Sequence, residues 1–297
     1  MKLFSLHASW RDLAMATLLC TVYSCNFAQT VEKDLITGLT TRGKGLSCDE
    51  VYLSDGENVI KRNTFTYGET FHVNFDGMEG FVREGESAFP DMQLLVISVE
   101  GDTALHLDDL YAGYEDGIDF SPLQLYAEVT VANPIHTGIE YTLHVNIRDK
   151  KGEGTYMTRL DFTVIRDKGI TVESEILTSR EVYLFSQQSG LTITNGLAGL
   201  DENIYLLFEG LEGFAVNAGQ VQVGLSMVLK DASGSVILDE PDLFGDAPLD
   251  YEDVHLQVAP NFILTGTEFA NPFSLVVRIW DKGSSAWISA STEIVVE

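Results

Sequence analysis

Apolar and polar residues alternate along two well-separated segments of the chain. The alternation is clean over residues 141–148, and residues 275–280 repeat it with fewer polar positions. A period of two is typical of strands with one buried face. A turn rich in Asp, Lys, Gly and Ser follows each segment, at residues 149–154 and 281–285, and a further alternating segment follows each turn. We therefore expect two β-hairpins, with glycine supplying a positive φ in each turn.

These two hairpins belong to an internal repeat. Four short motifs occur twice in the same order, and each second copy lies 131–133 residues after the first. The pairs are Glu50–Leu53 with Glu181–Leu184, Phe75–Phe81 with Phe208–Phe214, Leu107–Asp109 with Leu238–Glu240, and Ile147–Lys150 with Ile279–Lys282. Such regular recurrence indicates a tandem duplication. We expect repeats at 46–166 and 179–297, joined by a linker strand at 167–178 and preceded by an N-terminal linker at 29–45.

The periodicity predicts an all-β fold. After the N-terminal region, no long segment combines a sustained helical period with helix caps. Many short strands separated by Gly and Asp turns, in repeats of roughly 120 residues, are typical of antiparallel β-sandwiches. We predict two tandem immunoglobulin-like sandwiches related by internal duplication, with a jelly roll as the alternative.

Residues 1–28 have the features of a secretory signal peptide. Basic residues precede a short apolar run at residues 13–23, well below the roughly 20 apolar residues that span a bilayer. Two ends are open. The segment ending at Cys25 resembles the bacterial lipoprotein box, which would make Cys25 the lipidated first residue, whereas cleavage after Ala28 would place the mature start at Gln29. The later sequence contains no stretch apolar enough to span a membrane.

The chain is strongly acidic, with 45 acidic against 18 basic residues and a formal net charge of −27. Both repeats share the acidity. Nucleic acid is excluded as a direct partner, because phosphate binding needs clustered Lys and Arg. An anionic membrane surface is also an unfavourable electrostatic target. Of three cysteines, only Cys48 lies beyond the processed region, so we expect no internal disulfide and a half-buried thiol where a strand begins.

The sequence contains none of the common catalytic motifs. A Gly-x-Ser-x-Gly elbow, a His-Glu-x-x-His zinc helix, a Gly-x-x-x-x-Gly-Lys phosphate loop and a Cys-x-x-Cys pair are all absent. Carboxylates are abundant, but a carboxylate hydrolase needs one acid with a raised pKa in a cleft. We therefore expect that the protein is not an enzyme, and a carboxylate-based hydrolase is the less favoured alternative.

The recurring motif Phe-Asp/Glu-Gly-x-Glu-Gly-Phe is expected to serve the fold. Its two Phe side chains bracket turns that contain glycine, so both rings can anchor in a core while the glycines allow the bend. Two carboxylates beside flexible glycines would also suit a ligand loop. The presence of the motif in both repeats favours the structural interpretation.

Each repeat also contains a loop dense in carboxylates. Calcium is plentiful outside the cell and takes six to eight oxygen ligands, which would neutralise such a loop. Neither loop has the spacing of a helix–loop–helix calcium site, so a solvated acidic rim is the favoured interpretation, and no other cofactor is expected. The candidate calcium ligands are Asp108, Asp109, Asp116, Asp119, Asp239, Asp242, Asp246 and Asp250.

Two tryptophans are predicted to face each other on the outside of the last hairpin. Alternation places Trp280 and Trp287 outward, and the equivalent pair in the first repeat is expected to be Arg148 and Tyr156. Exposed aromatic side chains stack on sugar rings or anchor a protein partner. The alternative is a cross-strand pair that only stabilises the hairpin.

The lipoprotein-like box, the low cysteine count and the strand–Asp-Lys-Gly–strand end of each repeat resemble the exported, acidic, tandem immunoglobulin-like proteins of the Bacteroidota cell envelope. This resemblance implies an outer-membrane lipoprotein, periplasmic or cell-surface location, and a non-enzymatic binding or scaffolding role beside another envelope protein or complex. A glycan-binding surface module that uses the outward aromatics is the alternative function.

Overall fold

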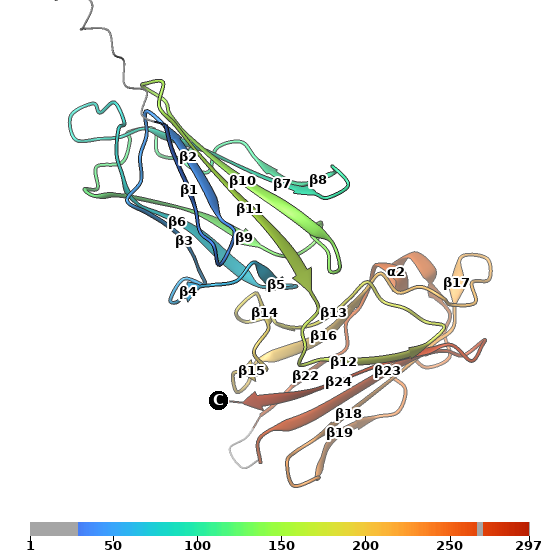
Figure 1. The fold of residues 1–297 in the computed structure, drawn as a ribbon. Helices are drawn as coiled ribbons and strands as arrows, with labels where there is room; N and C mark the ends of the chain where they lie inside the picture. The colour runs from blue at the N-terminus through green and yellow to red at the C-terminus, as the bar shows by residue number, and fades with distance from the viewer. Residues whose placement is uncertain (1–28, 266–269, 297) are drawn as a thin grey trace, which may run out of the picture.

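The computed structural model describes residues 29–265 and 270–296, which form two β-sandwiches in succession (Figure 1). We call residues 29–166 unit one and residues 167–296 unit two. Each unit packs two sheets around a hydrophobic core of its own. The predicted signal peptide and Cys25 lie outside the described residues. The prediction of an all-β, immunoglobulin-like fold is confirmed.

Unit one has a larger and a smaller sheet. The larger sheet has the order β1–β2–β11–β10–β7–β8, with β5 beside β11, and the smaller has the order β4–β3–β6–β9. The strands of the larger sheet are β1 (Gln29–Lys33), β2 (Thr40–Lys44), β5 (Thr64–Thr66), β7 (Pro90–Ser98), β8 (Thr103–Leu107), β10 (Glu140–Asp149) and β11 (Thr155–Ile165). Those of the smaller sheet are β3 (Glu50–Ser54), β4 (Val59–Ile60), β6 (Thr70–Met78) and β9 (Leu123–Thr130).

Unit two repeats this arrangement. Its larger sheet comprises β12 (Thr171–Glu175), β24 (Trp287–Val296), β23 (Phe273–Asp281), β18 (Val223–Lys230) and β19 (Val236–Glu240), with β15 (Leu197–Ala198) beside β24. Its smaller sheet comprises β14 (Leu191–Ile193), β13 (Glu181–Ser186), β16 (Asn203–Glu209), β21 (Gln257–Val258) and β22 (Asn261–Ile263). A small ribbon pairs β17 (Gln220–Val221) with β20 (Leu249–Asp250), and the short helix α2 (Tyr251–Leu256) follows it.

The strand order is that of an immunoglobulin-like sandwich. In unit one the chain crosses between sheets at β6–β7, β8–β9 and β9–β10, as Greek-key connections require. The short strand β5 pairs in parallel with β11, and β15 pairs in parallel with β24 in the same way. The shared crossing pattern and the shared parallel pair support a common origin for the two units.

Alternating burial along the strands builds the cores. In β10 the side chains of Tyr141, Leu143, Val145 and Ile147 are buried, and the intervening polar residues face outward. Within the core of unit one the rings of Phe65 and Phe71 stack with centroids 4.0 Å apart. Burying such a side chain stabilises the fold by about 1.5–3 kcal/mol. The one cysteine among the described residues, Cys48, is free.

Residues 29–45 do not form the linker that the sequence predicted. They form the hairpin β1–β2, and β2 pairs with β11 at the edge of the larger sheet. In unit two β12 pairs with β24 at the corresponding edge. Leu39 and Leu46, which flank β2, are buried, so apolar anchors on both sides hold this polar strand against the sandwich. The duplicated unit therefore begins earlier than the matching motifs indicate.

Aspartate, not glycine, shapes the two predicted hairpin turns. The glycines in these turns have ordinary negative or extended backbone angles. Instead, the carboxylates of Asp149 and Asp281 accept hydrogen bonds from the backbone N–H groups of Lys151 and Gly283, at 3.0 and 2.9 Å. Such Asx turns fix the chain reversal by a side chain.

Candidate functional site

The recurring heptapeptide has a structural role. Its first phenylalanine, Phe75 or Phe208, is fully buried in both units. Its last glycine, Gly80 or Gly213, has φ near +93° or +100°. A Cβ atom at Gly80 would lie 2.2 Å from the backbone oxygen of Gly45. A Cβ atom at Gly213 would lie 2.6 Å from the backbone oxygen of Ile176. Only glycine fits such a close approach with a positive φ.

A buried aspartate joins this heptapeptide to the last hairpin of each unit. Asp149 is 5% exposed and accepts a hydrogen bond of 2.7 Å from the backbone N–H of Val82. Asp281 is 2% exposed and accepts one of 2.8 Å from Ala215. Val82 and Ala215 each follow the heptapeptide directly. The two motifs recur together because one binds the other.

One aspartate of each acidic loop also holds the backbone in place through hydrogen bonds. Asp109 accepts hydrogen bonds of 3.2 and 2.8 Å from the backbone N–H groups of Met92 and Tyr111, and its other oxygen lies 2.7 Å from Nζ of Lys150. Burial raises the pKa of Asp109, but these hydrogen bonds outweigh burial and hold the pKa below its ordinary value. Asp109 is therefore an ionised structural residue.

The counterpart of Asp109 in unit two is Asp242. Its carboxylate lies 2.6 Å from Nζ of Lys282 and accepts hydrogen bonds of 3.3 Å from two backbone N–H groups. The motif comparison aligned Leu107–Asp109 with Leu238–Glu240. The structure shows that the true counterpart of Leu107–Asp109 begins two residues later, at Glu240. Leu107 pairs with Leu94, and Glu240 pairs with Met227. Leu107 and Glu240 are therefore equivalent, and the 133 residues between them equal the spacing of the two heptapeptides.

The other predicted calcium ligands do not converge on a point. Asp250 caps α2 by accepting a hydrogen bond of 2.9 Å from Glu252 N–H. Within residues 29–265 and 270–296, no three His, Cys, Asp or Glu side chains are arranged to hold a metal ion. Calcium binding stays a prediction to be tested by titration. The exposed members of the set are Asp108, Asp116, Asp119, Asp239, Asp246 and Asp250.

The outer face of the last hairpin carries the predicted tryptophan pair. Trp280 and Trp287 are direct partners in the β23–β24 register. The guanidinium of Arg278 lies 4.5 Å from the centre of the Trp287 ring, a cation–π contact, and the Trp287 indole N–H donates to Glu175 at 3.2 Å. Trp280 covers Gly224, where a Cβ would lie 2.0 Å from the indole. Both indoles line a shallow hollow of about 430 Å³.

Arg148 and Tyr156 do not form the equivalent pair in unit one. Arg148 lies opposite Thr155, so Thr155 is the counterpart of Trp287. Tyr156 is only 4% exposed, and its ring meets Phe75 edge-on in the core at 6.2 Å. A shift of one residue along a strand moves a side chain to the opposite face. The predicted aromatic surface is therefore confined to unit two.

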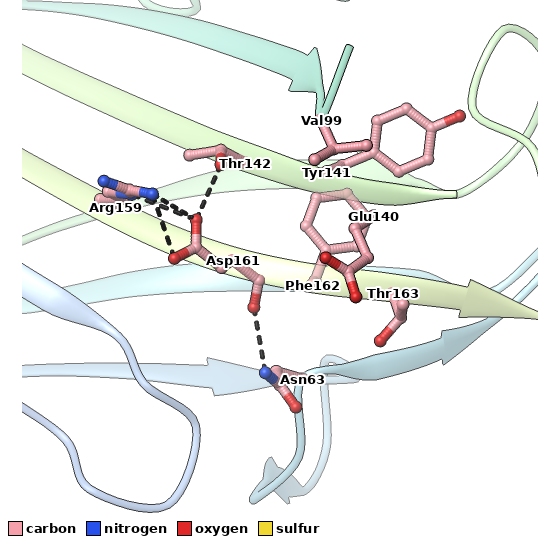
Figure 2. A pocket seen from close by; sticks show the side chains of 9 residues that line it. All are labelled: Asn63, Val99, Glu140, Tyr141, Thr142, Arg159, Asp161, Phe162 and Thr163. Carbon is pink, nitrogen blue, oxygen red and sulfur yellow. Dashed lines mark hydrogen bonds and ion pairs between the residues drawn. The ribbon is translucent and has the colours of Figure 1, made fainter. Parts of the chain in front are cut away.

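A polar pocket of about 360 Å³ lies on the outer face of β10 and β11 in unit one (Figure 2). Asp161 accepts a hydrogen bond of 2.7 Å from the Thr142 hydroxyl and pairs with Arg159 at 2.9 Å. Burial raises the pKa of Asp161, but the Thr142 and Arg159 interactions outweigh it and lower the pKa. A general acid needs a raised pKa, so Asp161 does not have the shift that this role requires.

The two units meet through aromatic and polar side chains that the sequence did not single out as a group. The rings of Tyr67 in unit one and Tyr183 in unit two lie 5.2 Å apart. Their hydroxyls donate to the two oxygens of Glu209, at 3.2 Å from Tyr67 and 2.6 Å from Tyr183. Burial raises the pKa of both phenols, so both stay protonated donors.

A second carboxylate, Glu181, is buried at this junction. It is 1% exposed and accepts hydrogen bonds from the backbone N–H and the hydroxyl of Thr137, at 2.9 and 3.3 Å. Its other oxygen has no hydrogen-bond partner. Burial raises the pKa of Glu181. Arg166 closes the junction by donating to backbone carbonyls of Ser179 and Arg180, at 2.6 and 2.9 Å.

Cys48 is placed as the sequence predicted. It is half-buried just before β3, and its Sγ lies 3.1 Å from the carbonyl oxygens of Glu50 and Asp76. Burial raises the pKa of the thiol to about 12. The thiolate, which is the reactive form, is therefore scarce at neutral pH.

Comparisons with known proteins give structural neighbours only. No family model and no curated protein matches this chain. Solved structures with similar features include the fibronectin(III)-like modules of Clostridium thermocellum CbhA, at 12% identity over 85% of this chain and 94% of that chain, with a TM-score of 0.19. A DUF3823 family protein from Bacteroides ovatus matches at 12% identity over 74% and 95%, with a TM-score of 0.21. Both TM-scores lie below 0.5, so the fold assignment rests on the strands and registers of this chain.

Proposed function

We propose that this protein is a non-enzymatic component of a bacterial cell envelope that binds or scaffolds another protein of an outer-membrane or surface assembly. The junction between the units is the observation that carries this proposal. Partly buried hydrogen bonds from Thr137 to Glu181 and from Tyr67 to Glu209 hold one sandwich against the other. Two sandwiches held in this way present their outer faces at a fixed spacing, which is what a scaffold requires.

Purification of the tagged full-length protein from envelope extract tests the binding role. We expect an outer-membrane or surface protein to co-purify in detergent at physiological salt, and to do so equally with Trp280→Ala, which alters only the aromatic surface. Recovery of the protein without any envelope partner would contradict the proposal.

Lipidation of Cys25 is the proposed mode of anchoring. Four peptide units separate Cys25 from the start of β1 at Gln29, so the anchor would hold unit one within about 14 Å of the membrane surface. No helix among the described residues is long and apolar enough to cross a membrane. Mass spectrometry of the mature N-terminus decides the question: we expect a diacylated Cys25, and a start at Gln29 would exclude the anchor.

Glycan binding by the last hairpin is a second candidate function. The half-buried indoles of Trp280 and Trp287, with Arg278 stacked on one of them, form an aromatic surface of the kind that binds sugar rings. Array binding that disappears with Trp280→Ala would favour this function. Unchanged binding in that variant would exclude this surface.

A further inference from the structure

The surface of unit two that receives unit one has a counterpart in unit one. In the smaller sheet of unit two, Glu181 lies opposite Glu209, and in unit one Glu50 lies opposite Asp76. Tyr183 lies two residues after Glu181, as Tyr52 lies two residues after Glu50. The strand registers therefore place a tyrosine and two carboxylates at the same positions on the outer face of each unit.

A fourth position completes the correspondence. Leu184 pairs with Ile193 as Leu53 pairs with Ile60, so Thr192 on β14 is equivalent to Val59 on β4. Thr192 packs against Gly68 of unit one so closely that a Cβ atom on Gly68 would lie 2.2 Å from the Thr192 hydroxyl oxygen. Four positions on unit two thus hold the end of unit one that carries Tyr67, Gly68 and Thr137.

In unit one the side chains at the same four positions lie together, and no sandwich end within residues 29–265 and 270–296 covers them. The Tyr52 hydroxyl donates to Asp76 at 3.3 Å, as the Tyr183 hydroxyl donates to Glu209. Glu50 is exposed, and Val59 is 56% exposed. All four residues line one hollow of about 350 Å³. The tyrosine–carboxylate contact is therefore in place without the sandwich end that covers it in unit two.

We propose that this outer face of β3, β4 and β6 binds the end of an immunoglobulin-like unit from another protein, in the way that unit two binds the end of unit one. The proposal rests on the binding function proposed above and assigns a surface to it. The acidic pair Glu50 and Asp76 needs hydrogen-bond donors. The partner therefore presents a tyrosine hydroxyl followed by a glycine, which copies Tyr67 and Gly68.

In a second copy of this chain, Tyr67 and Gly68 are already covered by unit two, and the corresponding end of unit two lacks that chemistry. Gly68 and Asp201 both have positive φ, 86° and 60°. Their N–H groups donate to Val131 and Leu264, the residues directly after β9 and β22. Leu200 therefore stands where unit one has Tyr67, and Asp201 stands where it has Gly68. Leucine offers no hydroxyl, and the Asp201 carboxylate would meet two further carboxylates. Both the charge and the hydrogen-bonding groups of this surface therefore favour a partner other than a second copy of this chain.

Site-specific photocrosslinking in cells that export the full-length protein tests the proposal. Benzoylphenylalanine replaces Val59 in the hollow, and a control replaces Val236, which is 55% exposed on the outer edge of unit two. We expect the Val59 product to map by mass spectrometry to a Tyr-Gly loop of a β-sandwich in another protein, and no such product from Val236. The substitution Glu50→Arg at this exposed position should lower the yield at least tenfold. Glu100→Arg, in the exposed turn between β7 and β8 of the other sheet, should leave it unchanged.

The remaining outcomes overturn the assignment. A crosslink to this chain itself would show self-association, and a crosslink to lipid, glycan or a protein without a sandwich would reject the partner class. If Val59 gives no product while an envelope protein still co-purifies, the surface is wrong and the binding function stands. If nothing co-purifies either, both fail.

Discussion

At the scale of single residues, the two units share the residues on which the local backbone geometry depends most strictly. Gly80 and Gly213 sit where the backbone of a neighbouring strand leaves no room for a Cβ, and both have a positive φ. Asp149 and Asp281 each accept two backbone hydrogen bonds while almost fully buried. Some outer-face positions differ between the units, such as Thr155 and its counterpart Trp287, because no such geometric requirement constrains them.

Gly80→Ala should destabilise the protein more than Gly85→Ala. Both positions have positive φ, +93° and +64°, so both variants incur backbone strain of about 1–3 kcal/mol. A Cβ at Gly80 also clashes with a backbone oxygen, whereas one at Gly85 meets nothing within 4 Å. We expect an additional loss of roughly 1–3 kcal/mol in the free energy of unfolding for Gly80→Ala, measured by urea denaturation. Equal losses of unfolding free energy in the two variants would show that the backbone around Gly80 shifts to make room for the Cβ atom.

At the scale of elements, the sequence predicted strands and repeats better than register. Alternation located the β23–β24 hairpin and the facing tryptophans, because apolar residues recur at every second position on both of its strands. The same reasoning slipped by one residue at Tyr156, and motif matching slipped by two at Leu238–Glu240. Short matches cannot detect small insertions between repeats, and a one-residue error exchanges the buried and exposed faces.

The junction was less predictable than the strands. Glu50 and Glu181 occupy the same motif position, yet one is exposed and the other is 1% exposed. The difference comes entirely from the neighbouring unit, and no local pattern records it. The hairpin of β1 and β2 was missed for a similar reason, since pairing with β11 organises it and its own sequence is polar.

Asp242→Asn should destabilise unit two, whereas Asp246→Asn should not. Asp242 accepts two backbone hydrogen bonds and an ammonium bond, but the Asp246 side chain is fully exposed and lies only near Lys282, at 3.3 Å. We expect losses of roughly 1–2 kcal/mol for Asp242→Asn and less than about 0.5 kcal/mol for Asp246→Asn, from urea unfolding at pH 7.

The pH dependence of the same variants gives an independent check. The Lys282 hydrogen bond, with the backbone bonds, lowers the pKa of Asp242 below its ordinary value of 3.8. A depressed folded-state pKa contributes stability that is complete above 3.8 and disappears as pH falls through the lower folded value. The wild type should therefore lose more stability than Asp242→Asn on acidification below pH 4, and parallel curves would contradict the role of this carboxylate.

At the scale of the whole molecule, the junction places a buried carboxylate between two acidic sandwiches. Burial raises the pKa of Glu181 above its ordinary value of 4.5. A raised folded-state pKa means that the folded protein gains stability as pH falls through that value toward 4.5, and loses it again as pH rises. Protonation of Glu181 is therefore expected to tighten the joint between the units in mild acid. His136, whose Nδ1 lies 3.4 Å from Glu181, acts in the opposite direction, because burial lowers its pKa.

Glu181→Gln should melt at a higher temperature than the wild type at pH 7 and show a flatter pH profile above 4.5. The amide oxygen can still accept both Thr137 hydrogen bonds, while the cost of burying a charge disappears. The same substitution at the exposed counterpart, Glu50→Gln, is the control and should leave the melting temperature unchanged. Thermal melting from pH 4.5 to 8 measures the effect, and a lower melting temperature for Glu181→Gln would indicate that the ionised form is required.

The net charge of −27 makes repulsion a property of the entire molecule, and it sets the expected response to calcium. If the acidic loops are solvated, added salt should raise the melting temperature by screening, and millimolar calcium should do no more than sodium chloride of equal ionic strength.

A true calcium site would add about 2.7 kcal/mol to the free energy of unfolding at one hundred times its Kd, or roughly 5 °C or more to the melting temperature of a unit of this size. We expect matched curves, because the ammonium groups of Lys150 and Lys282 already neutralise Asp109 and Asp242, the best-ordered carboxylates of the two loops. A calcium-specific rise abolished by Asp116→Asn or Asp246→Asn would overturn this expectation and locate the site in unit one or unit two.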